Sequence, residues 1–289
     1  MTYQRSQSGL SMVELLVALA ISSFLILGVT QVYIDNKRSY SFQQSQTENL
    51  ESGRYALLVL QQELTKAGYR RRPDEGTDIA FPAVGDLAGC GAFSLGQAIK
   101  RTAFNSLCIR YEPRNHLERN CLGELPVTAA DLEEAPYTSS DEIIIERLYF
   151  AKDDDEDGEA GALMCTRVHT TRAGATLDGR EAQSGELVSG LADLRYEFGT
   201  GTAADPRSIT QYTSASTTLP ILAVRHTALM RSAGARLRDS IDAATALTTW
   251  QDMVEVEDDD EVLAALKADD SGQLYQISQS NVMLRNLMP

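Results

Sequence analysis

The first part of the chain holds a long run, residues 10–34, whose side chains are uncharged except for one carboxylate, Glu14. About 20 apolar residues in an α-helix cross the ~30 Å hydrocarbon layer of a bilayer, because each residue adds about 1.5 Å. A charge at the centre of that layer costs roughly 2.5 to 3.5 kcal/mol. The run therefore predicts a membrane-spanning helix in which Glu14 requires a partner.

A secretory signal peptide is the alternative interpretation of this run. Ala18 and Ala20 supply the small-x-small pattern of a cleavage site, and Arg5 supplies one basic residue before the run. The apolar residues continue to Val29, so cleavage after Ala20 would leave half a hydrophobic helix on the mature protein. The single basic residue places the N-terminus in the cytoplasm and the rest of the chain outside it.

The helical pattern continues beyond the apolar run. Residues 39–68 contain no proline, and leucine and alanine recur there at spacings of three, four and seven, as on one face of a helix. We expect this apolar stripe to comprise Leu50, Ala56, Leu57, Leu60, Leu64 and Ala67. Gly68 suits a helix C-cap, and Pro73 prevents any continuation. The sequence predicts one helix from residue 10 to about residue 67.

From residue 73 onward the apolar runs become short and are separated by turn residues, which is typical of strands. The predicted strands are residues 106–111, 142–150, 162–169, 191–198, 219–230 and 273–284, with a short helix at 263–267. Glycine, proline and acidic loops between strands indicate an antiparallel sheet, and the apolar stripe of the helix can cover one of its faces. The fold class expected is α+β.

Charge and cysteine content narrow the function classes. The net charge is −15, which repels nucleic-acid phosphates, so we expect no nucleic-acid partner. Four cysteines follow the apolar run, and a chain exported from the cytoplasm is expected to form two disulfides, for which three pairings exist. None of the cysteines has a C-x-x-C spacing, and the three histidines are scattered, so no zinc site is predicted.

An acidic segment matches the first half of a calcium loop, with oxygen ligands at Asp153, Asp155 and Asp157 followed by Gly158. The position where a glutamate should complete the coordination is Met164, so a solvated loop between two strands is the simpler interpretation. The sequence therefore predicts no cofactor, and calcium is the alternative.

No phosphate loop, nucleophile elbow or H-E-x-x-H pattern occurs. His226 and Trp250 are expected in the core, and an enzyme is not predicted.

The order of features in GLSMVELLVALAI, residues 9–21, resembles the class III signal of type IV prepilins and type II secretion pseudopilins. In that family a prepilin peptidase cuts after the glycine and methylates the new amino terminus. The resemblance implies cleavage between Gly9 and Leu10 and N-methylation of Leu10, where the family usually has phenylalanine. It also implies that Glu14 pairs with the new amine of a neighbouring subunit and sets the axial register of packed helices.

The rest of the chain resembles PilW-like minor pilins. The segments that carry this likeness are SGRYALLVLQQELTKAGYRR, LCIRYEP, NCLG, ELVSGLADLRYEFG, AVRHTALMRS and NVMLRN. The family's fold is a long N-terminal helix packed on an antiparallel β-sheet domain with disulfide-stapled loops. The resemblance favours the pairs Cys121–Cys165 and Cys90–Cys108, with Cys108–Cys121 as the alternative.

The domain division that follows is a leader at residues 1–9, a membrane or filament-core helix at 10–34, its amphipathic continuation at 35–68 and a β-rich domain at 69–289. The function implied is that of a minor pilin that primes type IV pilus assembly in a tip complex. A GspJ-like pseudopilin of type II secretion and a membrane-anchored calcium-dependent binding module are the alternatives.

The partners implied are other minor pilins, the major pilin, prepilin peptidase, the inner-membrane assembly platform and a tip adhesin. The expected location is the inner membrane with a periplasmic domain, and then the extracellular pilus.

Overall fold

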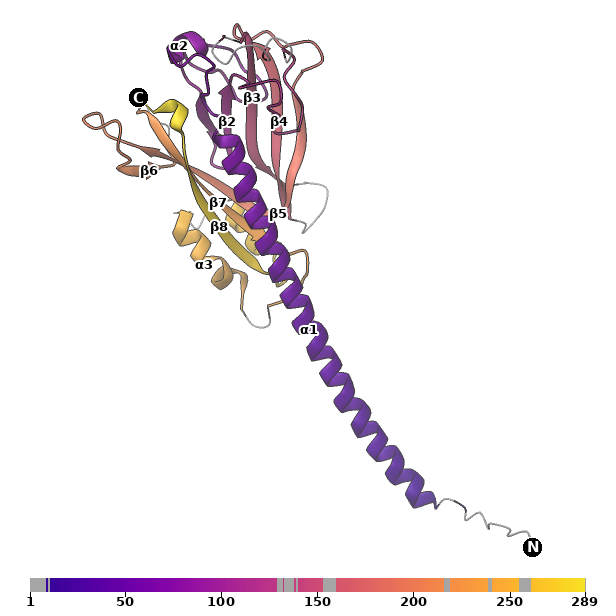
Figure 1. Cartoon of the computed structure of the whole chain (residues 1–289). Coiled ribbons are helices and arrows are strands. Elements are labelled where there is room, and N and C mark those ends of the chain that lie inside the picture. The colour runs from indigo at the N-terminus through magenta and orange to yellow at the C-terminus, as the bar shows by residue number, and fades with distance from the viewer. Residues whose placement is uncertain are drawn as a thin grey trace. The chain divides into compact units, whose positions relative to one another are not determined.

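A computed structural model describes residues 9, 11–128, 132, 138, 140–152, 160–215, 219–238, 241–254 and 261–288. The chain divides into two compact units, residues 1–45 and 46–289, and the helix α1 (Met12–Leu64) extends from the first into the second. The chain has the predicted α+β architecture, with a long apolar N-terminal helix, an antiparallel sheet and two disulfides (Figure 1).

The second unit is built on an eight-stranded antiparallel sheet. Its strands are β1 (Ile99–Ala103), β2 (Ser106–Tyr111), β3 (Glu142–Ala151), β4 (Gly161–Thr171), β5 (Gln183–Thr200), β6 (Gln211–Thr213), β7 (Ile221–Arg231) and β8 (Tyr275–Met283). They lie in the order β1-β2-β3-β4-β5-β7-β8, and β6 pairs with β5. The sequence predicted six of these strands; it missed β1 and β6, which are short, and the first half of β5, which is polar and contains Gly185 and Gly190.

The long strand β5 joins two parts of the sheet that diverge in Figure 1. Its first half pairs with β4 over residues 183–191, and its second half pairs with β7 over residues 191–200. The register shifts at both junctions, and Gly190 adopts a φ of 83°, which glycine alone reaches readily. The bulges let one sheet change direction at the cost of a local break in its hydrogen-bonded ladders.

The second part of α1 covers one face of the sheet. The α1 side of this core comprises Ala56, Leu60 and Leu64, and the turn after the helix adds Ala67, all of them fully buried. The predicted stripe is wrong at two positions: Leu50 is 43% exposed, and Leu57 is half-buried and outside the core. Near Leu50 the residues that contact the sheet are Asn49 and Gly53. Small and polar residues at this contact carry no hydrophobic signal, so the sequence pattern did not reveal it.

Two smaller cores cover the opposite face. The short helix α2 (Thr77–Ala80) and the loop after it pack Phe81, Cys90 and Phe93 against β2, β3 and β4. The helices α3 (Ala243–Val254) and α4 (Glu261–Ala268) pack against β5, β7 and β8 around Trp250, which is 1% exposed as predicted for a core residue. The helix α3 was not predicted.

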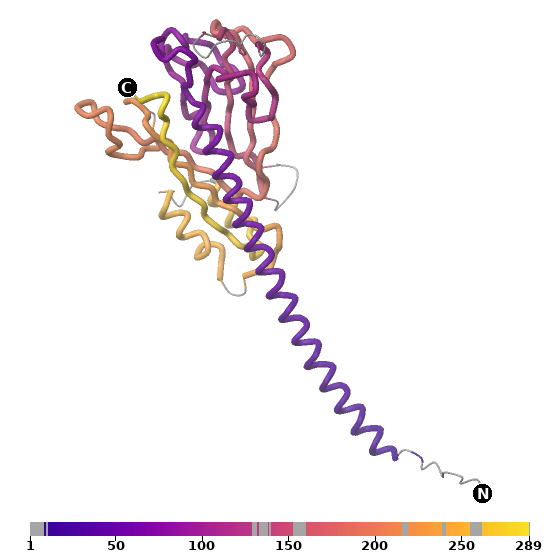
Figure 2. The backbone as a smooth tube through the Cα atoms, in the orientation of Figure 1, coloured from indigo at the N-terminus to yellow at the C-terminus, as the bar shows by residue number. Residues whose placement is uncertain are grey.

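The C-terminal strand follows the second part of α1, as the tube in Figure 2 shows in yellow. The Asn49 side chain donates a hydrogen bond of 3.1 Å to the Leu274 carbonyl just before β8. At the other end, the Asn286 amide donates to the Thr65 carbonyl at 2.9 Å and to the Ala67 carbonyl at 3.2 Å. The helix ends at Leu64, three residues before the predicted end, and Gly68, with a φ of 71°, closes the turn that follows it in the left-handed conformation that glycine favours.

Candidate functional site

The N-terminal site residues lie at the start of α1. Gly9 is exposed and outside any helix, whereas Leu10 falls outside the described residues. Ser11 precedes the helix, and its hydroxyl accepts a hydrogen bond of 3.3 Å from the Val13 amide, as an N-cap does. Glu14 lies in the first turn, where the helix dipole favours a negative charge. The sequence analysis did not consider Ser11, although S-x-x-E is a helix-start signature.

The apolar part of α1 leaves its side chains uncovered within the described chain. An 18-residue window in α1 has a mean hydropathy of 2.4 and is 0% buried, and by length and composition this helix can cross a membrane. Its hydroxyl groups are satisfied inside the helix, because Ser22 donates to the Ala18 carbonyl and Thr30 to the Ile26 carbonyl. Glu14 makes no ion pair with any residue that the structure describes.

A buried polar cluster fixes the end of α1 on the sheet. Lys66 donates to the Glu63 carboxylate and, at 2.8 Å, to the Arg119 carbonyl, while Tyr111 donates to Glu146 at 2.8 Å. Burial and the neighbouring Glu146 raise the pKa of Glu63 to about 9, so Glu63 holds a proton at neutral pH. The side chains of Glu63, Lys66, Tyr111 and Glu146 are all buried.

A second buried pair joins β3 and β4. His169 Nδ1 lies 2.6 Å from Glu142, and its Nε2 lies 2.8 Å from the Asn120 amide, which donates to it. Burial raises the pKa of Glu142, but hydrogen bonds from His169 and the Thr128 amide outweigh that effect and lower it. Both ring nitrogens of this fully buried histidine are used, so its role is structural, as expected for a core residue.

The disulfides join Cys90 to Cys108 and Cys121 to Cys165, with Cα separations of 5.9 Å and 6.4 Å. This is the connectivity that the resemblance implies. The second bridge holds the loop before β3 against β4, and its Cys121 amide donates to Glu146 at 2.8 Å. It therefore connects the buried cluster beneath α1 with the sheet.

The calcium hypothesis concerns Asp153, Asp155 and Asp157, which lie outside the described residues. Among the residues that the structure does describe, no group of three or more potential ligands is arranged to hold a metal ion. Calcium binding by the acidic segment stays an untested hypothesis, and a solvated loop stays the prediction.

Comparison with known proteins identifies the N-terminal segment. Residues 4–30 match the model of the prokaryotic N-terminal methylation motif. No curated protein matches the chain. Among solved structures, a type IV-like pilin from Thermus thermophilus is similar at 13% identity and a TM-score of 0.36, over 83% of this chain and 97% of that one. The chain thus carries a prokaryotic N-terminal methylation motif at the start of a long apolar helix, and an antiparallel sheet domain follows that helix.

Proposed function

We propose that this chain is a PilW-like minor pilin that prepilin peptidase cuts between Gly9 and Leu10 and methylates at Leu10. The observation that carries the proposal is the methylation motif at residues 4–30, which contains Glu14 in the first turn of an uncovered apolar helix. Cleavage creates a positive amine at Leu10, and Glu14 is the one charged side chain in the apolar run that follows it. The proposed role of Glu14 is to bind the amine of a neighbouring subunit.

The physical support is electrostatic. At a separation of 4 Å, opposite unit charges attract by about 4 kcal/mol at an effective dielectric of 20, against about 1 kcal/mol in water. Removing one member of a buried pair costs about 3 to 5 kcal/mol, because the other charge is left without a partner. Among parallel apolar helices such a pair selects one axial register, since every other register leaves Glu14 unpaired.

The proposed assembly follows from this pairing. The precursor is anchored in the inner membrane by α1 with its sheet domain in the periplasm, and the processed chain then enters the extracellular pilus. It primes assembly in a tip complex with other minor pilins, next to the major pilin and a tip adhesin, on the inner-membrane platform. The uncovered apolar surface of α1 supports lateral contacts of this kind, because large exposed apolar surfaces mark interaction sites.

The first test is processing and assembly in the native host. Mass spectrometry of the mature protein is expected to show loss of residues 1–9 and a methylated Leu10 as the first residue. Glu14→Ala is expected to reduce incorporation into pili at least about a hundredfold, from the cost of stranding a buried charge. Glu51→Ala, which removes an exposed acid farther along α1, serves as the matched control and should assemble normally.

A mature protein that begins elsewhere than Leu10, or a Glu14→Ala chain that assembles like the parent, would contradict the proposal. Recovery with type II secretion pseudopilins instead of pilus subunits would identify the GspJ-like alternative.

A further inference from the structure

The two edges of the sheet differ in how they are protected. Unprotected edge strands invite pairing with another chain, and proteins block them with short strands, charges and bulges. The first edge, β1, has all three: five residues, the charges of Lys100 and Arg101, and a register shift after Arg101. The last edge, β8, has nine residues paired with β7 without a shift, within an uncharged stretch at 271–284.

The register shows which main-chain groups of β8 face outward. The Ser232 amide donates to the Leu274 carbonyl, and the Leu284 amide donates to the Leu222 carbonyl, so even-numbered residues of this segment pair with β7. In an antiparallel pair the alternate residues point their N–H and C=O groups the other way. The N–H and C=O groups of residues 277, 279, 281 and 283 therefore face away from the sheet, and none of them bonds to the described main chain.

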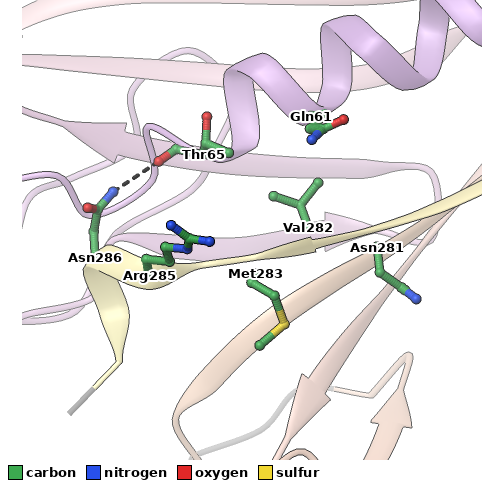
Figure 3. A pocket seen from close by; sticks show the side chains of 7 residues that line it. All are labelled: Gln61, Thr65, Asn281, Val282, Met283, Arg285 and Asn286. Carbon is green, nitrogen blue, oxygen red and sulfur yellow. Dashed lines mark hydrogen bonds between the residues drawn. The ribbon is translucent and has the colours of Figure 1, made fainter.

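A groove of about 430 Å³ lies beside this edge, between α1 and the end of β8 (Figure 3). Gln61 of α1 and Thr65 of the turn after it line one side, and Asn281, Met283 and Arg285 line the other. The side chains of Gln61, Asn281 and Arg285 are exposed and make no hydrogen bond to any residue in the described part of the chain. The groove thus presents amide groups and one unpaired cation next to an open strand.

We propose that the outer edge of β8 binds an extended segment of a different protein by strand addition, with a carboxylate of that segment on Arg285. Only an extended main chain matches donors and acceptors that alternate along an edge, and edge pairing of this kind is an established mode of peptide recognition. The net charge of −15 opposes a second copy of this chain, because two such surfaces repel each other. The inference goes beyond the proposed function and does not require processing at Gly9.

The test uses the full chain in its own host. Met283, which is 45% exposed in the groove, is replaced by benzoylphenylalanine, and light then links it to whatever lies on the edge. The same group at Thr102 on β1 is the positional control. We expect an adduct at 283 but not at 102, formed with an extended segment of another protein that carries an acidic residue near the link.

Proline at 281 tests the main-chain contact itself. Asn281→Pro removes an outward N–H and leaves the bonds to β7 intact, since proline is tolerated where the N–H of an edge strand faces solvent. It is expected to lower the adduct yield at least about tenfold, whereas Asn281→Ala, which keeps the N–H and removes only the side-chain amide, should lower it much less. Arg285→Glu leaves the backbone unchanged and is expected to reduce the yield similarly, which keeps the test decisive if the proline chain does not fold.

Several outcomes overturn the inference: no adduct at 283, an adduct unaffected by Asn281→Pro in a folded chain and by Arg285→Glu, or an adduct with a second copy or within the same chain. The mass of the same samples reports cleavage at Gly9. A processed chain without an adduct refutes strand addition alone, and an unprocessed chain with an adduct refutes the pilin proposal alone.

Discussion

His226 and His169 are both fully buried in the same sheet but differ in their surroundings. His169 uses both ring nitrogens, on Glu142 and Asn120. Neither ring nitrogen of His226 has a hydrogen-bond partner among the described residues. The hydroxyl of Tyr196, which lies opposite His226 on β5, also has no partner there. Burial lowers the pKa of His226 to about 4, because the charged ring has lost its water.

This contrast predicts opposite effects of one substitution. His226→Leu is expected to raise the free energy of unfolding by about 1 to 3 kcal/mol at pH 7, because it removes buried polar atoms that are not hydrogen-bonded. His169→Leu is expected to lower it by a similar amount, since Glu142 and Asn120 lose their partner. Denaturant unfolding of the two variants measures both, and a destabilised His226→Leu chain would refute the account of His226.

The pH dependence of stability provides a second readout of the same residue. The ordinary pKa of histidine is about 6.5, so between pH 6.5 and 4 the unfolded chain binds a proton at position 226 that the folded chain does not. The free energy of unfolding should therefore fall as the pH drops through this range, by up to about 1.4 kcal/mol per pH unit from this residue. His226→Leu should remove that contribution, and an unchanged slope would contradict it.

At the scale of elements, the contact between α1 and β8 depends on a glycine. A Cβ atom added to Gly53 would lie 2.5 Å from the Ser278 Oγ atom and 3.2 Å from the Met230 Cγ atom. A glycine inside a helix lowers the stability of the helix by about 1 kcal/mol relative to alanine. Its presence here indicates that the close packing of α1 against β8 offsets this loss. The contact belongs to the same side of the sheet as the groove beside β8.

Gly53→Ala therefore tests helix–strand packing. Helix propensity alone favours the alanine by about 1 kcal/mol, but the close contact should cancel that gain or reverse it. In a Ser278→Ala background the Oγ atom is gone, and Gly53→Ala is expected to become more favourable by about 1 kcal/mol. A double-mutant cycle of unfolding free energies measures the coupling, and additive effects would show that the contact is unimportant.

At the scale of the whole molecule, the two disulfides close loops of different length, with sequence separations of 18 and 44 residues. In the chain-entropy description these loops correspond to about 3 and about 4 kcal/mol of stabilisation. The longer one also supports the cluster of Glu63, Lys66 and Glu146, through the Cys121 amide. Both disulfides thus stabilise the sheet domain that follows α1.

Paired substitutions separate their contributions. Replacing Cys121 and Cys165 with serine is expected to lower the free energy of unfolding by about 4 kcal/mol, and replacing Cys90 and Cys108 by about 3 kcal/mol. Chemical denaturation under oxidising conditions compares the two double variants with the parent chain. A smaller loss for the Cys121–Cys165 pair than for the Cys90–Cys108 pair would refute this ranking.

Much of the architecture could be predicted from the sequence, because helices, strands and their ends depend on residues that are close together in the chain. The uncharged run around Glu14 and the glycine at 68 predicted the helix and its approximate end. Short apolar runs separated by turn residues, with alternation in the second half of β5 and in β7, predicted an antiparallel sheet. The N-terminal methylation motif lies in consecutive residues as well. None of these features requires knowledge of what is packed against them.

Tertiary structure decided the rest, because it depends on which distant residues share an environment. No local signal joins Glu63 to Glu146, places Gly53 against Ser278 or leaves His226 without a partner. The open edge at β8 likewise exists only because the sheet order puts that strand last. Glu14 belongs to both groups: its sequence context predicts that it requires a partner, and we propose that a neighbouring chain supplies one.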